Sequence, residues 1–303
     1  MVQFSHLKGM VEMNEFKNCD SLKSYLNKES KRLNISITNV YNTFFSRDLL
    51  YRLSKIDKSM NIIVKGSFAQ AVHLGKIVRP ITDIDLTSTI DHHNPLILLV
   101  NAMCDKEGDN DFDYILRGAP KRTNTGIIKL PIATKYGKIN HPIGIDYREN
   151  HPCIYEKQLK LVPKVFSKDE EYEVVVPSME ETLAEKLCII AESTKTDVLN
   201  TRTKDFYDIY HLHGGDYDLD KFSYYFEKML QDRGKIRDIS SLNTDYLNND
   251  FIERHESVWQ SNKKHYEFLD DEVDLKGAVY YTKSTLKEQF QRIRQGKNKV
   301  YKI

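Results

Sequence analysis

The sequence lacks any apolar run long enough to cross a membrane. The run LILLV after Pro95 falls far short of the roughly 20 apolar residues that a transmembrane helix needs. The N-terminal stretch MVQFSHLKGMVEMNEFKN mixes both charges and has no apolar segment typical of a secretion signal. These absences predict a cytoplasmic protein with no membrane partner.

The sequence also has few cysteines and almost no net charge. Its four cysteines lie tens of residues apart without a C-x-x-C pair, so we expect neither a zinc site nor a disulfide framework. The 45 basic residues nearly balance the 44 acidic ones, so the overall charge favours no class of partner. The absence of internal repeats excludes a solenoid.

The remaining composition is typical of folded domains. Of the 303 residues, 40% are hydrophobic, and 18 tyrosines and 13 phenylalanines can fill a core. Apolar residues recur at helical spacing over residues 20–57, and strand-like runs separated by Gly, Pro and Asn follow over residues 61–146. We therefore predict an α+β protein. A mixed sheet with flanking helices forms the N-terminal domain, residues 1–177, and a helical C-terminal domain follows, residues 178–303.

Two aspartates interrupt the strand-like run DIDLTST. Residues i and i+2 of a strand point to the same face, so Asp83 and Asp85 project together while Ile84 and Leu86 face the core. Two neighbouring carboxylates repel each other and need a cation to stay ionised together. Mg²⁺, which proteins usually hold through one or two carboxylates and substrate phosphates, meets that need.

Upstream of these aspartates, the run NIIVKGS leads from a strand through Gly66 and Ser67 into a helix. Glycine lets the backbone approach a ligand closely, and the N–H groups at a helix N-terminus bind anions. A phosphate site beside a pair of carboxylates suits the chemistry of nucleoside triphosphates. For each motif taken alone, an exposed strand or an ordinary turn is the alternative.

The run VKGS, followed by R-x-x-T-D-I-D-L, resembles the polymerase-β-type nucleotidyltransferase superfamily, which carries hG[GS] and then Dh[DE]h. Within it, the sequence is most similar to the AbiEii/AbiGii toxin family, because LAEKL and RTKDFYD follow in the same order. The resemblance covers roughly residues 61–212. It implies the nucleotidyltransferase fold and catalytic roles for Asp83, Asp85, Lys186 and Asp205.

Lys186 lies in the middle of an apolar helical stripe. A lysine is almost never buried without a partner, so we expect a carboxylate or a substrate phosphate beside it. A lysine that reaches out from the edge of the stripe is the alternative. Asp205 and Asp208 share a face of the next helix, where a first-turn position after a Thr203 cap offers a purely structural explanation.

Asp146, in the motif GIDY at the end of a strand-like run, is our candidate for the third carboxylate of the superfamily. By resemblance, such a group helps to bind the metal ion and orients the attacking hydroxyl. A satisfied aspartate at the end of a strand is the equal alternative. The remaining candidates for substrate binding are Lys65, Gly66, Ser67, Arg79, Thr82, Arg202, Lys204 and Asp208.

The sequence thus predicts a nucleotidyltransferase that uses Mg²⁺ and transfers NMP from an NTP to an acceptor. By resemblance, the acceptor is an RNA 3′ end such as that of tRNA, and the protein is the toxin of a toxin–antitoxin or abortive-infection system with a separate antitoxin protein. One rival is a small-molecule nucleotidyltransferase of the aminoglycoside type. The other is a catalytically inactive nucleotide-binding interaction protein.

Two basic stretches are candidate RNA contacts. The C-terminal segment KSTLKEQFQRIRQGKNKVYKI is rich in lysine and arginine, and so is the loop RGAPKRT. A solvated tail is the equal alternative for the C-terminal segment, and an ordinary surface loop is the alternative for RGAPKRT.

Overall fold

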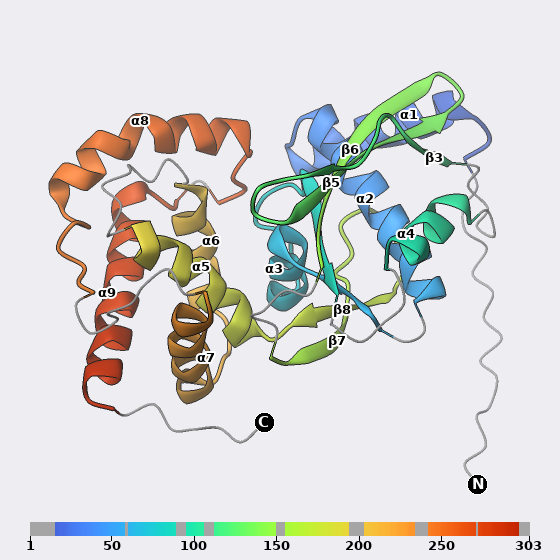
Figure 1. Cartoon of the computed structure of the whole chain (residues 1–303). Helices are drawn as coiled ribbons and strands as arrows, with labels where there is room; N and C mark the ends of the chain where they lie inside the picture. The colour runs from blue at the N-terminus through green and yellow to red at the C-terminus, as the bar shows by residue number, and fades with distance from the viewer. Residues whose placement is uncertain are drawn as a thin grey trace, which may run out of the picture.

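Figure 1 shows the computed structural model of the chain, which describes residues 16–57, 60–88, 95–105, 112–149, 155–193, 203–233, 242–270 and 272–296. None of the helices in these ranges has the length and apolar character to span a bilayer. In chain order the elements are α1 (Cys19–Leu33), α2 (Ile37–Ile56), β1 (Ile62–Val64), α3 (Gly66–Leu74), β2 (Asp83–Ser88), α4 (Pro95–Cys104), β3 (Asp113–Leu116), β4 (Lys121–Arg122), β5 (Ile127–Tyr136), β6 (Ile139–Arg148), β7 (Lys157–Leu161), β8 (Glu173–Pro177), α5 (Met179–Ser193), α6 (Lys204–His213), α7 (Leu219–Asp232), α8 (Asn249–His265) and α9 (Leu275–Arg294).

In the part of the chain that the structure describes, six strands form a mixed sheet. Its order is β1-β2-β6-β5-β3, and β4 pairs with β5. Strands β2 and β6 run parallel, whereas β1 with β2, β5 with β6, and β3 and β4 with β5 are antiparallel. Strands β7 and β8 form a separate antiparallel pair. The predicted α+β class with a mixed sheet in the N-terminal half is confirmed.

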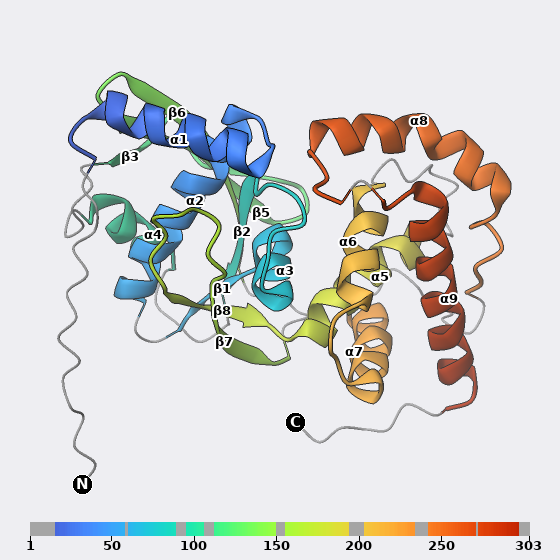
Figure 2. The same ribbon diagram turned by 180° about the vertical axis from the view of Figure 1, so that it is seen from behind.

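One face of the sheet is covered by helices from the N-terminal half. Ile84 of β2 and Ile145 of β6 belong to the same buried cluster as Phe45 and Leu49 of α2. Figure 2 shows α1 and α2 in front of the strands when the molecule is seen from behind. The alternating burial along β5 and β6 follows from this packing, because one face of each of these strands is buried.

The C-terminal helices enclose a second buried cluster. It contains Trp259 and Phe290, and also Val78 from the connection between α3 and β2. In Figure 1, α3 lies between the sheet and these helices. Within the described residues, membership changes from the first cluster to the second between Val176 and Met179. We propose that this interval, which includes the predicted boundary at 177, separates two domains.

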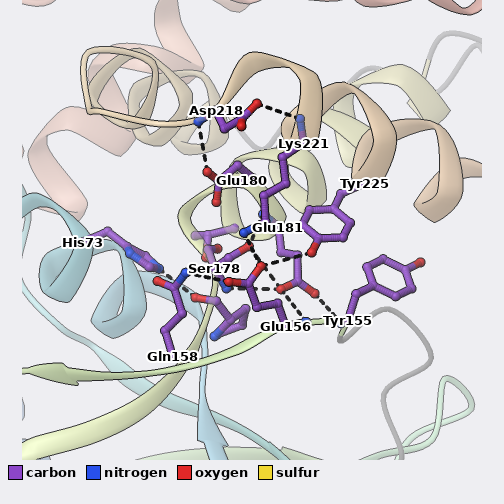
Figure 3. A network of polar contacts seen from close by, with 12 residues as sticks. His73, Tyr155, Glu156, Gln158, Ser178, Glu180, Glu181, Asp218, Lys221 and Tyr225 are labelled. Atoms are coloured by element: carbon purple, nitrogen blue, oxygen red, sulfur yellow. Dashed lines mark hydrogen bonds and ion pairs between the residues drawn. The ribbon is translucent and has the colours of Figure 1, made fainter. Parts of the chain in front are cut away.

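A polar network joins β7 and β8 to the first turns of α5 and α7 (Figure 3). The Glu181 carboxylate accepts hydrogen bonds from the backbone N–H groups of Tyr155, Glu156 and Ser178. Burial raises the pKa of Glu181 to about 7, although these donors lower it. Lys221 of α7 pairs with the Glu156 carboxylate. These hydrogen bonds and this ion pair therefore connect α5 and α7 to the strand pair β7–β8.

The C-terminal basic segment is part of a packed helix. Phe290 of α9 is 2% exposed, and Arg292 pairs with Asp220 of α7. The alternative of a solvated tail is therefore wrong as far as residue 296, because the apolar side of this helix belongs to the second cluster. Three further basic residues lie outside the described residues: Lys297, Lys299 and Lys302.

We expect Phe290→Ala to lower the free energy of unfolding by about 3–5 kcal/mol, because it empties a buried aromatic site. Lys287→Ala, at an exposed position of the same helix, should change it by less than about 0.5 kcal/mol. Urea unfolding followed by circular dichroism measures both. Equal stability of the two variants would contradict the packing of α9.

Candidate active site

Asp83 and Asp85 lie on one face of β2, in the arrangement that the strand period predicts. Ile84 and Leu86 are 0% and 2% exposed and belong to the core, whereas both aspartates are only partly buried. The Thr82 hydroxyl donates to Oδ1 of Asp83 at 3.2 Å. The face of β2 that points away from the core therefore carries two carboxylates.

A third carboxylate comes from β6. Because β6 runs parallel to β2, the register places Asp146 directly beside Asp85. Register partners on neighbouring strands point to the same face, so the two side chains share one side of the sheet. Burial and then the charge of Asp83 raise the pKa of Asp85 to about 6, and Asp146 adds to the rise. Lys186 and Lys65 lower the pKa of Asp85, but they do not cancel the rise.

Gly66 begins α3 directly against Asp85. Its φ is +62°, and a Cβ there would lie 1.9 Å from Oδ2 of Asp85, so only glycine fits. Lys65, the N-cap residue, donates its backbone N–H to the Asp85 carbonyl at 2.8 Å and makes no side-chain cap. The buried Ser67 hydroxyl has no partner within the described residues. An uncapped helix N-terminus with a spare donor is a ready anion site.

Lys186 of α5 lies between two aspartates of α6. Its Nζ is 3.0 Å from Oδ1 of Asp205 and 2.9 Å from Oδ2 of Asp208, and both carboxylates are fully buried. The Arg79 guanidinium donates two further bonds to Asp208, at 2.9 and 3.0 Å. The expectation of a carboxylate partner for Lys186 is confirmed, and a lysine reaching into solvent is wrong.

These contacts keep the buried groups charged. Burial lowers the pKa of Lys186, but Asp208 and Asp205 outweigh burial and raise this pKa above its usual value. Burial raises the pKa of Asp208, but Arg79 and Lys186 outweigh it and hold the pKa well below its usual range. The stabilisation from Asp208 is therefore present above its unfolded pKa of about 4 and is lost as the pH falls through its folded pKa.

Arg79 and Lys204, two of the predicted phosphate contacts, have protein groups as their neighbours. Arg79 is 5% exposed and its guanidinium is engaged by Asp208, while the Lys204 ammonium lies 4.5 Å from the centre of the Tyr266 ring. Neither side chain lines the pocket described below. Arg202 lies outside the described residues. The structure thus places Arg79 in the buried network rather than at a phosphate site.

Thr203 does not cap α6 with its side chain. Its hydroxyl accepts a hydrogen bond from the Asn262 side chain at 2.8 Å, and it makes no capping bond to the helix. The predicted Thr203 side-chain cap is therefore wrong, although Asp205 does lie in the first turn of α6, where the helix dipole favours a carboxylate. Both aspartates also neutralise Lys186.

The sheet face, the start of α3 and one side of α5 surround a pocket of about 270 Å³. Its charged lining consists of Lys65, Asp85, Asp146, Arg148, Glu185, Lys186 and Arg233. A second pocket of about 230 Å³, between α2, β1 and β8, lacks such a gathering of charges. The first pocket is therefore the candidate active site.

Lysines continue the row of carboxylates across the sheet. The register places Lys129 of β5 beside Asp146 and Lys121 of β4 beside Lys129. Nζ of Lys129 lies 3.1 Å from Oδ2 of Asp146, and Lys121 is exposed. From Asp85 in the pocket, the register thus leads through Asp146 to Lys129 and Lys121 at a positively charged edge of the sheet. We call these two lysines the basic row. Sequence reasoning found the loop with Lys121 but missed Lys129, because only strand pairing brings Lys129 to Asp146.

Sequence reasoning also missed Glu185 and Arg148. Glu185 forms an ion pair with Lys65, with 2.7 Å between Oε1 and Nζ. Arg148 follows Asp146 by two positions on the same face of β6. That spacing was a usable signal for Arg148, whereas the contact of Glu185 with Lys65 spans 120 residues and left no local signal.

The carboxylates fit a cation that a substrate helps to hold. Within the described residues, no group of three or more His, Cys, Asp and Glu side chains is arranged to bind a metal ion. Mg²⁺ that is shared with substrate phosphates needs only one or two carboxylates. Asp83 and Asp85 supply two, and their mutual repulsion is what a cation would relieve.

The sheet, the paired aspartates and the glycine at the helix start together define a protein of the nucleotidyltransferase class. The chain belongs to the AbiEii family of nucleotidyl transferase toxins of type IV toxin–antitoxin systems, whose sequence model matches residues 48–292. The resemblance inferred from the motifs is confirmed, and the chain is a nucleotidyltransferase. A comparison with curated proteins found no match.

Several solved structures are similar to this chain at low sequence identity. JHP933 from Helicobacter pylori is 14% identical, with 86% of this chain and 96% of that chain covered and a TM-score of 0.50. A putative nucleotidyltransferase from H. pylori is 14% identical, with coverages of 86% and 98% and a TM-score of 0.46. The enzyme ANT(2'')-Ia in complex with adenylyl-2''-tobramycin is 12% identical, with coverages of 64% and 98% and a TM-score of 0.37.

We expect Lys186→Met to lower the free energy of unfolding by about 3–5 kcal/mol, because it leaves buried carboxylates without their cation. Lys264→Met, at an exposed position of α8, serves as the control and should leave stability nearly unchanged. Urea unfolding of both variants gives the comparison. A Lys186→Met protein as stable as the control would show that the buried network does not depend on this ammonium.

Proposed function

We propose that the protein transfers a nucleoside monophosphate from an NTP to the 3′ end of an RNA. The acceptor hydroxyl attacks the α-phosphorus, loses its proton, and pyrophosphate leaves. The observation that carries this proposal is the close contact of Gly66 with Asp85, together with the register that leads from Asp85 through Asp146 to the basic row. Such an enzyme, acting on the tRNA acceptor end, would stop growth, and a separately encoded antitoxin would counteract it.

The triphosphate binds at the start of α3. Gly66 starts this helix against Asp85, its N-cap residue Lys65 makes no side-chain cap, and the buried Ser67 hydroxyl in the same turn has no partner among the described residues. Lys65 adds an ammonium group that lines the same pocket. Backbone N–H groups and a lysine are the usual partners of nucleotide phosphates. This end of the pocket therefore holds the leaving pyrophosphate.

Asp83 and Asp85 hold Mg²⁺ together with the nucleotide. When bound, the ion neutralises charge on the attacking and leaving oxygens of the transfer. Asp146 lies beside Asp85 in the register, on the side of the basic row. This position suits a carboxylate that orients the acceptor hydroxyl and receives its proton.

Lys186 and Asp205 act as a coupled pair at the wall of the pocket. The Lys186 side chain is 12% exposed and lines the pocket, so its ammonium can touch the substrate. Asp205 and Asp208 hold that ammonium in place from the buried side. We therefore assign substrate contact to Lys186 and a positioning role to the two aspartates and Arg79.

The basic row favours a polyanionic acceptor. Strands lie about 4.8 Å apart, so Lys129 and Lys121 extend positive charge roughly 10 Å beyond Asp146. An RNA backbone gains from such contacts through counterion release. A cationic aminoglycoside would be repelled by the same lysines, so this rival is disfavoured. A catalytically inactive protein is disfavoured because all three carboxylates are in place.

We expect Asp85→Asn to abolish nucleotide transfer while the protein stays folded, because the substitution removes one charge of the carboxylate pair. The assay incubates the protein with each labelled NTP, Mg²⁺ and total cellular RNA. Asp250→Asn, at an exposed position of α8, is the matched control and should transfer normally. Transfer by Asp85→Asn at the control rate would show that the carboxylate pair is misassigned. Labelling of a small cationic acceptor in place of RNA would support the aminoglycoside-type rival.

We expect Lys121→Ala to raise the KM for RNA by about two- to fivefold and to reduce the salt slope of RNA binding by about 1, because one phosphate contact is lost. The affinity for NTP should not change, because Lys121 does not line the pocket. Lys264→Ala, at an exposed position of α8 outside both basic stretches, tests whether any exposed lysine has the same effect. Identical RNA kinetics for the Lys121 variant and the wild type would remove the basic row from the acceptor path.

A further inference from the structure

We propose that Glu185 competes with the nucleotide phosphates for Lys65 and thereby sets the affinity of the pocket for triphosphates. This inference rests on the proposed nucleotide site at the start of α3. Oε1 of Glu185 lies 2.7 Å from Nζ of Lys65. The carboxylate thus occupies the partner position that a phosphate oxygen would take on this lysine.

The pair lies inside the pocket and links its two walls. Both Lys65 and Glu185 line the pocket, Lys65 from the N-cap of α3 and Glu185 from α5. The backbone N–H of Lys65 donates to the Asp85 carbonyl at 2.8 Å, so the lysine is anchored beside the carboxylates. An anion that binds in the pocket at the start of α3 must therefore meet this ion pair.

The two pocket lysines differ in how easily they can change partner. Lys186 is held by two fully buried carboxylates, Asp205 and Asp208, which would be left uncompensated if the ammonium moved away. The side chain of Glu185 is 27% exposed, compared with 10% for Lys65. A carboxylate at the edge of the pocket can regain water when its partner leaves, so the exchange costs little. Lys65 is therefore the ammonium that a substrate can recruit.

Glu185 also opposes the substrate directly. A fixed carboxylate in the pocket raises the free energy of any anion that enters it. A triphosphate overcomes this repulsion with several oxygens that can bind Lys65, the start of α3 and the metal ion. Glu185 therefore weakens the binding of a nucleotide phosphate group that reaches Lys65.

The test compares nucleotide affinities of the wild type, Glu185→Gln and Glu171→Gln. Calorimetric titration with each NTP and Mg²⁺, without acceptor, measures the dissociation constants. We expect Glu185→Gln to tighten NTP binding roughly two- to fivefold, because the competing charge is gone. Glu171 pairs with Lys164 at 3.1 Å on the surface and does not line the pocket. Glu171→Gln removes the same charge there and should leave the dissociation constant for NTP unchanged.

A double variant tests whether the gain acts through Lys65. In the background of Lys65→Met, the substitution Glu185→Gln should yield a smaller gain than in the wild type, because part of the effect is competition for the ammonium. Should the glutamine variant not fold, Glu185→Ala carries the same expectation.

Two results would overturn the inference. Unchanged or weaker NTP binding in Glu185→Gln would show that Glu185 positions Lys65 rather than competing for it. A fall in kcat with an unchanged dissociation constant would place Glu185 in the reaction itself. Failure of the proposed function looks different, because the wild-type protein would then bind no NTP at all.

Discussion

The buried network of Arg79, Lys186, Asp205 and Asp208 links the two halves of the chain. Lys186 and Asp208 come from the helical half, whereas Arg79, which grips Asp208 with two bonds, comes from the connection that leads into β2. Two cations and two carboxylates balance in this network, so every member is needed to keep the others neutralised. Because Arg79 lies just before β2, the network also sets where Asp83 stands relative to α5.

This constraint gives the pocket its electrostatic character. Negative charge gathers on the sheet, where burial and neighbouring carboxylates raise the pKa of Asp85 to about 6. Lys65 and Lys186 supply positive charge, and both have carboxylate partners. In our proposal, Lys65 exchanges Glu185 for a nucleotide phosphate, whereas Lys186 keeps its buried partners. The contact of Gly66 with Asp85 places the start of α3, our proposed phosphate site, next to the carboxylates.

Local sequence patterns account for much of the fold and for part of the site. Alternation in β2 correctly put Asp83 and Asp85 on one face, and helical spacing around Lys186 correctly indicated a buried partner. The basic residues of the C-terminal segment leave a solvated tail open as an alternative, but Leu286 and Phe290 have helical spacing and are buried in α9. The domain boundary and the roles of the site residues stay predictions.

The amino-acid sequence by itself determined three features: the strand with two carboxylates, the glycine at the start of a helix, and the lysine that needs an anionic partner. Each of them is set by the order and spacing of residues within one stretch of chain. Tertiary structure decided which distant groups meet. The parallel pairing of β2 with β6 brought Asp146 to Asp85, and the packing of α5 on α3 brought Glu185 to Lys65. No local period encodes these contacts, because strand order and helix packing are set by burial of the whole chain.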